Sequence, residues 1–156
     1  MPFNARIVGS PSELSIEKLN NILIEKNLKS SVEIIGPLLG QEKVNEYKNA
    51  DIFVFPTYNE AFGLVILEAM QFGLPVISTF EGSIPELVVD NETGFLVEKK
   101  NPQILAEKIA ILLNDRDLRK KMGNNGFNRF KEKFTFERFE QNILDIYDKV
   151  IADTEN

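Results

Sequence analysis

Short apolar runs alternate with longer stretches that repeat apolar residues at helical spacing along this 156-residue chain. The apolar runs predict strands, and the amphipathic stretches predict helices. We expect strands at residues 5–8, 32–35, 51–55, 75–78 and 94–97. We expect helices at residues 13–26, 41–49, 64–72, 85–88, 103–114, 117–130 and 136–151. The regular alternation of strand and helix indicates a parallel sheet.

The predicted fold class is α/β, a Rossmann-like, doubly wound parallel sheet followed by C-terminal helices. The run Asp51-Ile52-Phe53-Val54-Phe55 is almost continuously apolar, which is typical of a strand buried on both faces of a sheet. The length is near the commonest size of a single domain, so we expect one domain over residues 1–156.

The composition excludes several classes of chemistry. The chain has no cysteine and no histidine, so disulfides, thiolate nucleophiles and imidazole bases are excluded. Its net charge of −6 argues against binding nucleic acid, which needs a basic face. No apolar run approaches the roughly 20 residues of a membrane span, and the first residues do not resemble a signal peptide. We therefore expect a cytoplasmic protein, and no metal cluster is visible in the sequence.

Candidate chemistry gathers after the predicted strand at 51–55. Ligands of open parallel sheets bind beyond the carboxyl ends of the strands, where Glu60 and Gly63 precede the next helix. Gly63 allows close approach to the helix amides, which favour an anion. Glu68 lies on a largely apolar helix and suits two adjacent ribose hydroxyls. Alternatively, Glu60 is an exposed loop acid and Glu68 faces water.

Other positions also keep two interpretations. Glu86 is either a helix first-turn acid or a donor contact. The pair Gly9-Ser10 is either a turn with a helix cap or part of a ligand site. The phenylalanines from Phe127 to Phe139 are expected in the core.

Charge along the chain indicates where an anionic ligand would find cations. Residues 49–98 contain no Lys or Arg but eight acids. Helix amides can stabilise part of an anion's charge. The remaining positive charge must come from elsewhere.

The same residues resemble a known family. Glu60 and Glu68 are separated by seven residues, with Phe62-Gly63-Leu64 between them and Ala69-Met70 after them. This stretch resembles the signature of glycosyltransferase family 4, which contains retaining enzymes of the GT-B fold. The segments at 49–56, 73–77, 82–88 and 91–97 resemble the strands and loops around that signature.

The resemblance implies roles for individual residues. Glu68 would hold the nucleotide ribose of a nucleoside-diphosphate sugar, and Glu60 would lie at the donor sugar as the catalytic residue. The remaining donor-binding positions would be the amides of Phe62, Gly63 and Leu64, the base border at Ile35, Gly36 and Leu38, and Gly9 at a strand end. No cofactor or metal is implied.

The resemblance also implies a larger enzyme. A GT-B enzyme has an N-terminal acceptor domain, and its donor domain opens with a strand and helix that carry an Arg and a Lys. We expect that this chain lacks both, is inactive alone, and needs that domain or a partner chain. The whole enzyme would transfer a glycosyl group to a saccharide or lipid-linked acceptor, with association at the inner membrane face through the absent half.

Two other functions stay open. The chain could be a non-catalytic nucleotide-binding partner subunit of a two-chain glycosyltransferase. A weaker alternative is a sugar-nucleotide epimerase of the same fold, which would need catalytic acids from the absent half.

Overall fold

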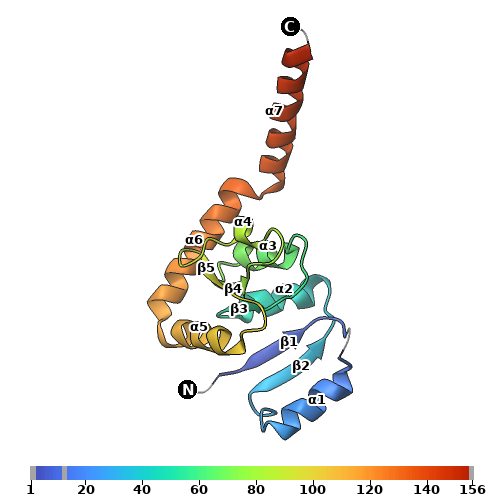
Figure 1. Cartoon of the computed structure of the whole chain (residues 1–156), viewed down its shortest axis with the longest axis vertical. Coiled ribbons are helices and arrows are strands. Elements are labelled where there is room, and N and C mark those ends of the chain that lie inside the picture. The colour runs from blue at the N-terminus through green and yellow to red at the C-terminus, as the bar shows by residue number, and fades with distance from the viewer. Residues whose placement is uncertain (1–2, 12–13, 155–156) are drawn as a thin grey trace. The chain divides into compact units, whose positions relative to one another are not determined.

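The computed structural model describes residues 3–11 and 14–154, which alternate strand and helix as predicted (Figure 1). The chain divides into two compact units, Met1–Glu46 and Tyr47–Asn156. The boundary falls within the helix α2 (Gly40–Asn49).

The first unit contains strands β1 (Ala5–Val8) and β2 (Val32–Gly36). They pair in parallel, with Ala5 opposite Val32. Figure 1 shows helix α1 (Ile16–Glu25) beside β2, and the two elements are in contact. The predicted sheet direction is therefore confirmed for this pair.

The beginning of α1 differs from the prediction. The helix was expected from Glu13, which lies outside the described residues, and the first helical residue is Ile16. Ser15 has an extended backbone and is the N-cap of the helix. Its Oγ accepts a hydrogen bond from the Lys18 amide at 3.2 Å. The cap of this helix is thus Ser15 and not Ser10.

The second unit contains strands β3 (Phe53–Phe55), β4 (Val76–Thr79) and β5 (Gly94–Val97), hydrogen-bonded in that order. Both pairings are parallel. Strand β3 begins two residues later than predicted, and β4 is displaced by one residue. Every residue of β4 and β5 is buried, as the apolar runs predict for strands covered on both faces.

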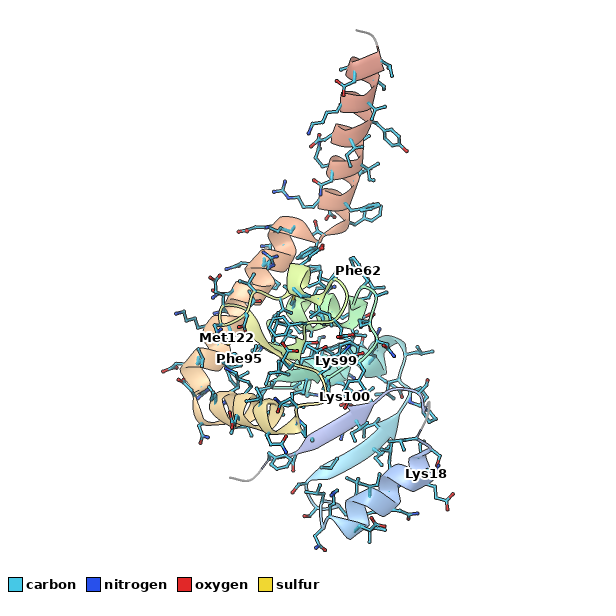
Figure 2. All side chains as sticks on the ribbon, viewed as in Figure 1. Lys18, Phe62, Phe95, Lys99, Lys100 and Met122 are labelled. Atoms are coloured by element: carbon cyan, nitrogen blue, oxygen red, sulfur yellow. The ribbon has the colours of Figure 1, made fainter. Side chains whose placement is uncertain are left out.

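Neighbouring residues of β4 point to opposite faces of this sheet and join different core clusters. Val76 packs with side chains of α3 (Leu64–Gln71) and α4 (Ile84–Leu87). Ile77 packs with side chains of α5 (Pro102–Asn114) and α6 (Arg116–Lys133), among them Met122 beside Phe95 (Figure 2). The α/β, Rossmann-like prediction of parallel strands with flanking helices is confirmed.

The last helix, α7 (Phe136–Thr154), corrects one expectation about the core. Among its residues 136–154, none is buried. Phe136 is 74% exposed and Phe139 is 61% exposed, because α7 continues beyond the surface that α6 covers (Figure 1). Phe127 is also exposed, whereas Phe130 and Phe134 pack against the core.

Within residues 3–11 and 14–154, no helix combines the length and the apolar character needed to cross a bilayer.

Candidate functional site

The carboxyl ends of β3, β4 and β5 lie along one edge of their sheet, because the three strands are parallel. The segments that leave this edge are 56–63 after β3, 80–83 after β4 and 98–101 after β5. The predicted residues from Glu60 to Glu68 belong to the first segment and the helix that follows it.

Glu60 is held at the entrance of α3. One carboxylate oxygen, Oε1, accepts hydrogen bonds from the Phe62 amide at 3.2 Å and from the Gly63 amide at 3.0 Å. Gly63 precedes the helix with φ +85°, a left-handed conformation that glycine adopts without strain. The Glu60 side chain is therefore half-buried and fixed, which differs from the exposed loop acid of the alternative interpretation.

The same contacts change the picture of the helix entrance. The Phe62 and Gly63 amides were expected to face a ligand, and each has an acceptor in Glu60. Their role toward a ligand stays a prediction. The side chains of Phe62 and Leu64 are 47% and 65% exposed, and Phe62 points outward in Figure 2.

Glu68 lies one turn into α3 and is half-buried. Its Oε2 accepts a hydrogen bond of 2.9 Å from the Tyr47 hydroxyl. Burial, and then the bond to the Glu68 carboxylate, raise the pKa of Tyr47 well above its ordinary value. The tyrosine ring stacks on Phe72 at the end of α3, with ring centroids 5.6 Å apart. Tyr47 thus orients Glu68, and no motif in the sequence indicated this contact.

The segment after β4 supports the segment that carries Glu60. Gly82 has φ +52°, and a Cβ at this position would overlap the carbonyl oxygen of Glu60. The Ser83 amide donates to the Ala61 carbonyl at 3.1 Å. The buried Thr79 hydroxyl donates to the Thr57 carbonyl at 3.0 Å. Backbone contact, and not side-chain packing alone, therefore sets the position of Glu60.

A cation stands at the end of the acidic segment. Lys99, labelled in Figure 2, follows β5. Its Nζ lies 2.8 Å from Glu81 Oε1. The charge count along the sequence stopped at Glu98 and missed this pair. The register of β4 and β5 would have shown it, because Glu81 and Lys99 each follow the last paired residues, Thr79 and Val97, by two positions.

The first unit brings together the glycines at the carboxyl ends of β1 and β2. The Gly9 amide donates to the Gly36 carbonyl at 2.9 Å. Both residues have positive φ, +148° and +85°, and a Cβ at either would meet no atom within 4 Å. Ile35 and Leu38 beside them are half-buried. The predicted donor-binding residues thus form one group in each unit.

The sequence of this chain matches known glycosyl transferases. The family description "Glycosyl transferases group 1" matches residues 2–129. The chain is 34% identical over 148 residues to an uncharacterized glycosyltransferase of Methanocaldococcus jannaschii, and the match covers 95% of this chain and 41% of that protein. It is also 34% identical over 150 residues to the capsular polysaccharide biosynthesis glycosyltransferase CapM of Staphylococcus aureus, covering 96% of this chain and 38% of CapM. The chain therefore spans about two fifths of the length of these relatives.

Solved structures agree with the sequence relatives. The sucrose-phosphate synthase of Thermosynechococcus elongatus has a TM-score of 0.81 at 31% identity, over 95% of this chain and 38% of that one. The C-terminal domain of the glycosyl transferase group 1 protein LpcC from Francisella tularensis has a TM-score of 0.77 at 31% identity. That match covers 85% of this chain and 70% of the domain.

Proposed function

This chain belongs to the glycosyl transferases group 1 family, with the GT-B fold, and on that premise we propose that it is the donor-binding part of a retaining glycosyltransferase of family 4. Its donor is a nucleoside-diphosphate sugar. Because the chain spans about two fifths of the length of its relatives, the activity proposed for the whole enzyme includes a second half that binds the acceptor.

The proposed reaction exchanges one bond at the anomeric carbon of the sugar. The bond from this carbon to the diphosphate oxygen breaks, and a bond to an acceptor hydroxyl oxygen forms on the same face. The nucleoside diphosphate departs with the electron pair, and the hydroxyl proton passes to its leaving oxygen. Negative charge therefore grows on the diphosphate during the reaction and needs positive groups near it.

The observation that carries the proposal is the arrangement of the two glutamates around α3. Glu60 is fixed at the helix entrance by the Phe62 and Gly63 amides, and Glu68 is oriented by Tyr47. A carboxylate has about four lone-pair positions, so the bonds seen here are compatible with further bonds to sugar hydroxyls. We assign the donor sugar to Glu60 and the ribose to Glu68.

The glycine pair of the first unit supports a border for the base. Gly9 and Gly36 present backbone without side chains, with open space where a Cβ would be. A flat base can approach such a surface closely. Ile35 and Leu38 would add apolar contact.

The balance of charge supports a role for the acceptor half. Residues 49–98 lack Lys and Arg, and Lys99 is already paired with Glu81. We therefore assign the cations that face the diphosphate to the strand and helix that open the family's donor domain, and to the acceptor half. The relative CapM is a capsular polysaccharide biosynthesis glycosyltransferase, which favours a saccharide acceptor.

Titration of the ¹⁵N-labelled chain with UDP, GDP and ADP tests the proposal. We expect one of the three to shift amide resonances of residues 60–68, with weak affinity because the cations lie elsewhere. The Glu60→Gln variant keeps an acceptor oxygen. It should lower the affinity for the sugar ester of that nucleotide more than the affinity for the nucleotide itself. The control Glu92→Gln changes an exposed acid of the same unit and should bind as the natural chain does. Shifts confined to residues outside 60–68 would refute the site.

A further inference from the structure

The ion pair of Glu81 and Lys99 lies beyond the last residues of β4 and β5. It continues the register of the two strands at the edge of the sheet, with Nζ and Oε1 2.8 Å apart. Cross-strand pairs of opposite charge stabilise neighbouring strands. Here the pair instead joins the two segments that leave the strands.

Glu81 is adjacent to the residue that touches the Glu60 backbone. Gly82 packs so closely on the Glu60 and Ala61 carbonyls that no side chain fits between them. The Ser83 amide adds a hydrogen bond of 3.1 Å to the Ala61 carbonyl. A displacement of the 80–83 segment would therefore move the Glu60 peptide as well.

The Glu60 peptide in turn sets the direction of its carboxylate. Its Oε1 is held by amides only two and three residues further along the chain. The carboxylate and its two donor amides belong to the same short turn before α3. Their hydrogen bonds therefore depend on the backbone conformation of residues 60–63. On the basis of the proposed function, we infer that Lys99 is a positioning residue, whose ion pair with Glu81 holds the 80–83 segment against Glu60 and aims its carboxylate at the donor sugar.

The exposure of the pair fixes the size of the expected effect. The side chain of Lys99 is 48% exposed and that of Glu81 is 22% exposed. Pairs at such sites change an equilibrium by about 1.4- to 5-fold. Loss of the pair should therefore shift the population of the Glu60 turn and leave the fold intact.

NMR without any ligand tests the positioning directly. The variants Lys99→Gln and Glu81→Gln should each move the amide resonances of Phe62 and Gly63, in the same direction. The matched control Lys100→Gln removes the same charge from the next residue, which has no ion pair within residues 3–11 and 14–154, and should leave those resonances in place. The reversed pair, Lys99→Glu with Glu81→Lys, should restore them. Unmoved resonances in Lys99→Gln, or equal movement in Lys100→Gln, would overturn the inference.

Binding then separates positioning from direct contact with phosphate. The nucleotide that binds best among UDP, GDP and ADP is tested together with its glucose ester. Lys99→Gln should lower the affinity for this glucose ester by about 1.4- to 5-fold. Its affinity for the nucleotide without sugar should not change. Equal loss for both ligands would mean that Lys99 itself contacts the diphosphate, contrary to the inference. If the natural chain binds no nucleotide, the proposed function fails, and the ligand-free resonances still decide the role of Lys99.

Discussion

The Tyr47 hydroxyl donates a hydrogen bond to the Glu68 carboxylate across 2.9 Å, although 21 positions separate the two residues in the chain. Tyr47 comes from the last turn of α2, and its ring stacks on Phe72 at the end of α3. The tyrosine therefore joins two elements and also fixes an acid that we assign to the ribose.

Removal of this hydroxyl should lower stability and change its dependence on alkaline pH. Tyr47→Phe is expected to cost about 1–3 kcal/mol at pH 7, because a hydrogen bond to a charged group is lost. Folding raises the pKa of Tyr47 above its ordinary value of 10.0, so the stabilising contribution is complete below pH 10 and declines as the pH rises further. Urea unfolding at pH 7 and above pH 10 measures both effects.

The difference in free energy of unfolding between Tyr47→Phe and the natural chain should become smaller above pH 10. The control Tyr147→Phe removes a hydroxyl from a tyrosine of α7 that is 62% exposed, and should change stability little. If Tyr47→Phe and the natural chain differ in free energy of unfolding by the same amount at every pH, the expected link between stability and the Tyr47 pKa is wrong.

The ribose role of Glu68 predicts a selective loss of affinity. Glu68→Ala should lower the affinity for the preferred ribonucleoside diphosphate by roughly 10- to 100-fold, because hydrogen bonds to a charged group are lost. Inorganic pyrophosphate, which has no ribose, should bind equally to the variant and the natural chain. Isothermal titration calorimetry with both ligands measures the difference, and equal loss for both would contradict the role.

Two glycines of α6 predict opposite effects of the same substitution. A Cβ at Gly123 would overlap the Gly73 carbonyl oxygen, so Gly123→Ala should destabilise the chain by about 1–3 kcal/mol. A Cβ at Gly126 would meet its nearest atom, Met70 Cγ, at 3.7 Å, an ordinary contact. Gly126→Ala should therefore stabilise the helix by roughly 0.5–1 kcal/mol. Urea unfolding of both variants measures the change in stability. A gain in stability from Gly123→Ala would show that α6 tolerates separation from Gly73.

Helix α7 should contribute little to the fold of the second unit. Its residues 136–154 bury no side chain, so a chain that ends at Thr135 should keep its free energy of unfolding within about 0.5 kcal/mol. Binding of a dye that reports exposed apolar surface should fall, because side chains such as Ile146 and Tyr147 are removed. A large loss of stability would reveal packing that the exposed residues do not suggest.

Much of the fold could be predicted because each element carries its own local pattern. The apolar run at 94–97 is β5 with unchanged bounds, and Gly73 ends α3 in a left-handed conformation as a helix-ending glycine should. The exposed phenylalanines of α7 were not predictable, since apolar spacing indicates that a helix face could be buried and not whether another element covers it.

The candidate site, like the fold, could be predicted from the sequence only in part. By itself, the sequence determined the parallel α/β fold, the glycine before α3 and the two glutamates of the motif, because periodicity and turn chemistry act over a few neighbouring residues. Only the tertiary structure decided that Tyr47 meets Glu68, that Lys99 meets Glu81 and that Gly82 supports Glu60. Those contacts join residues 18 to 22 positions apart in the chain. They follow from strand register and packing, which local patterns do not specify.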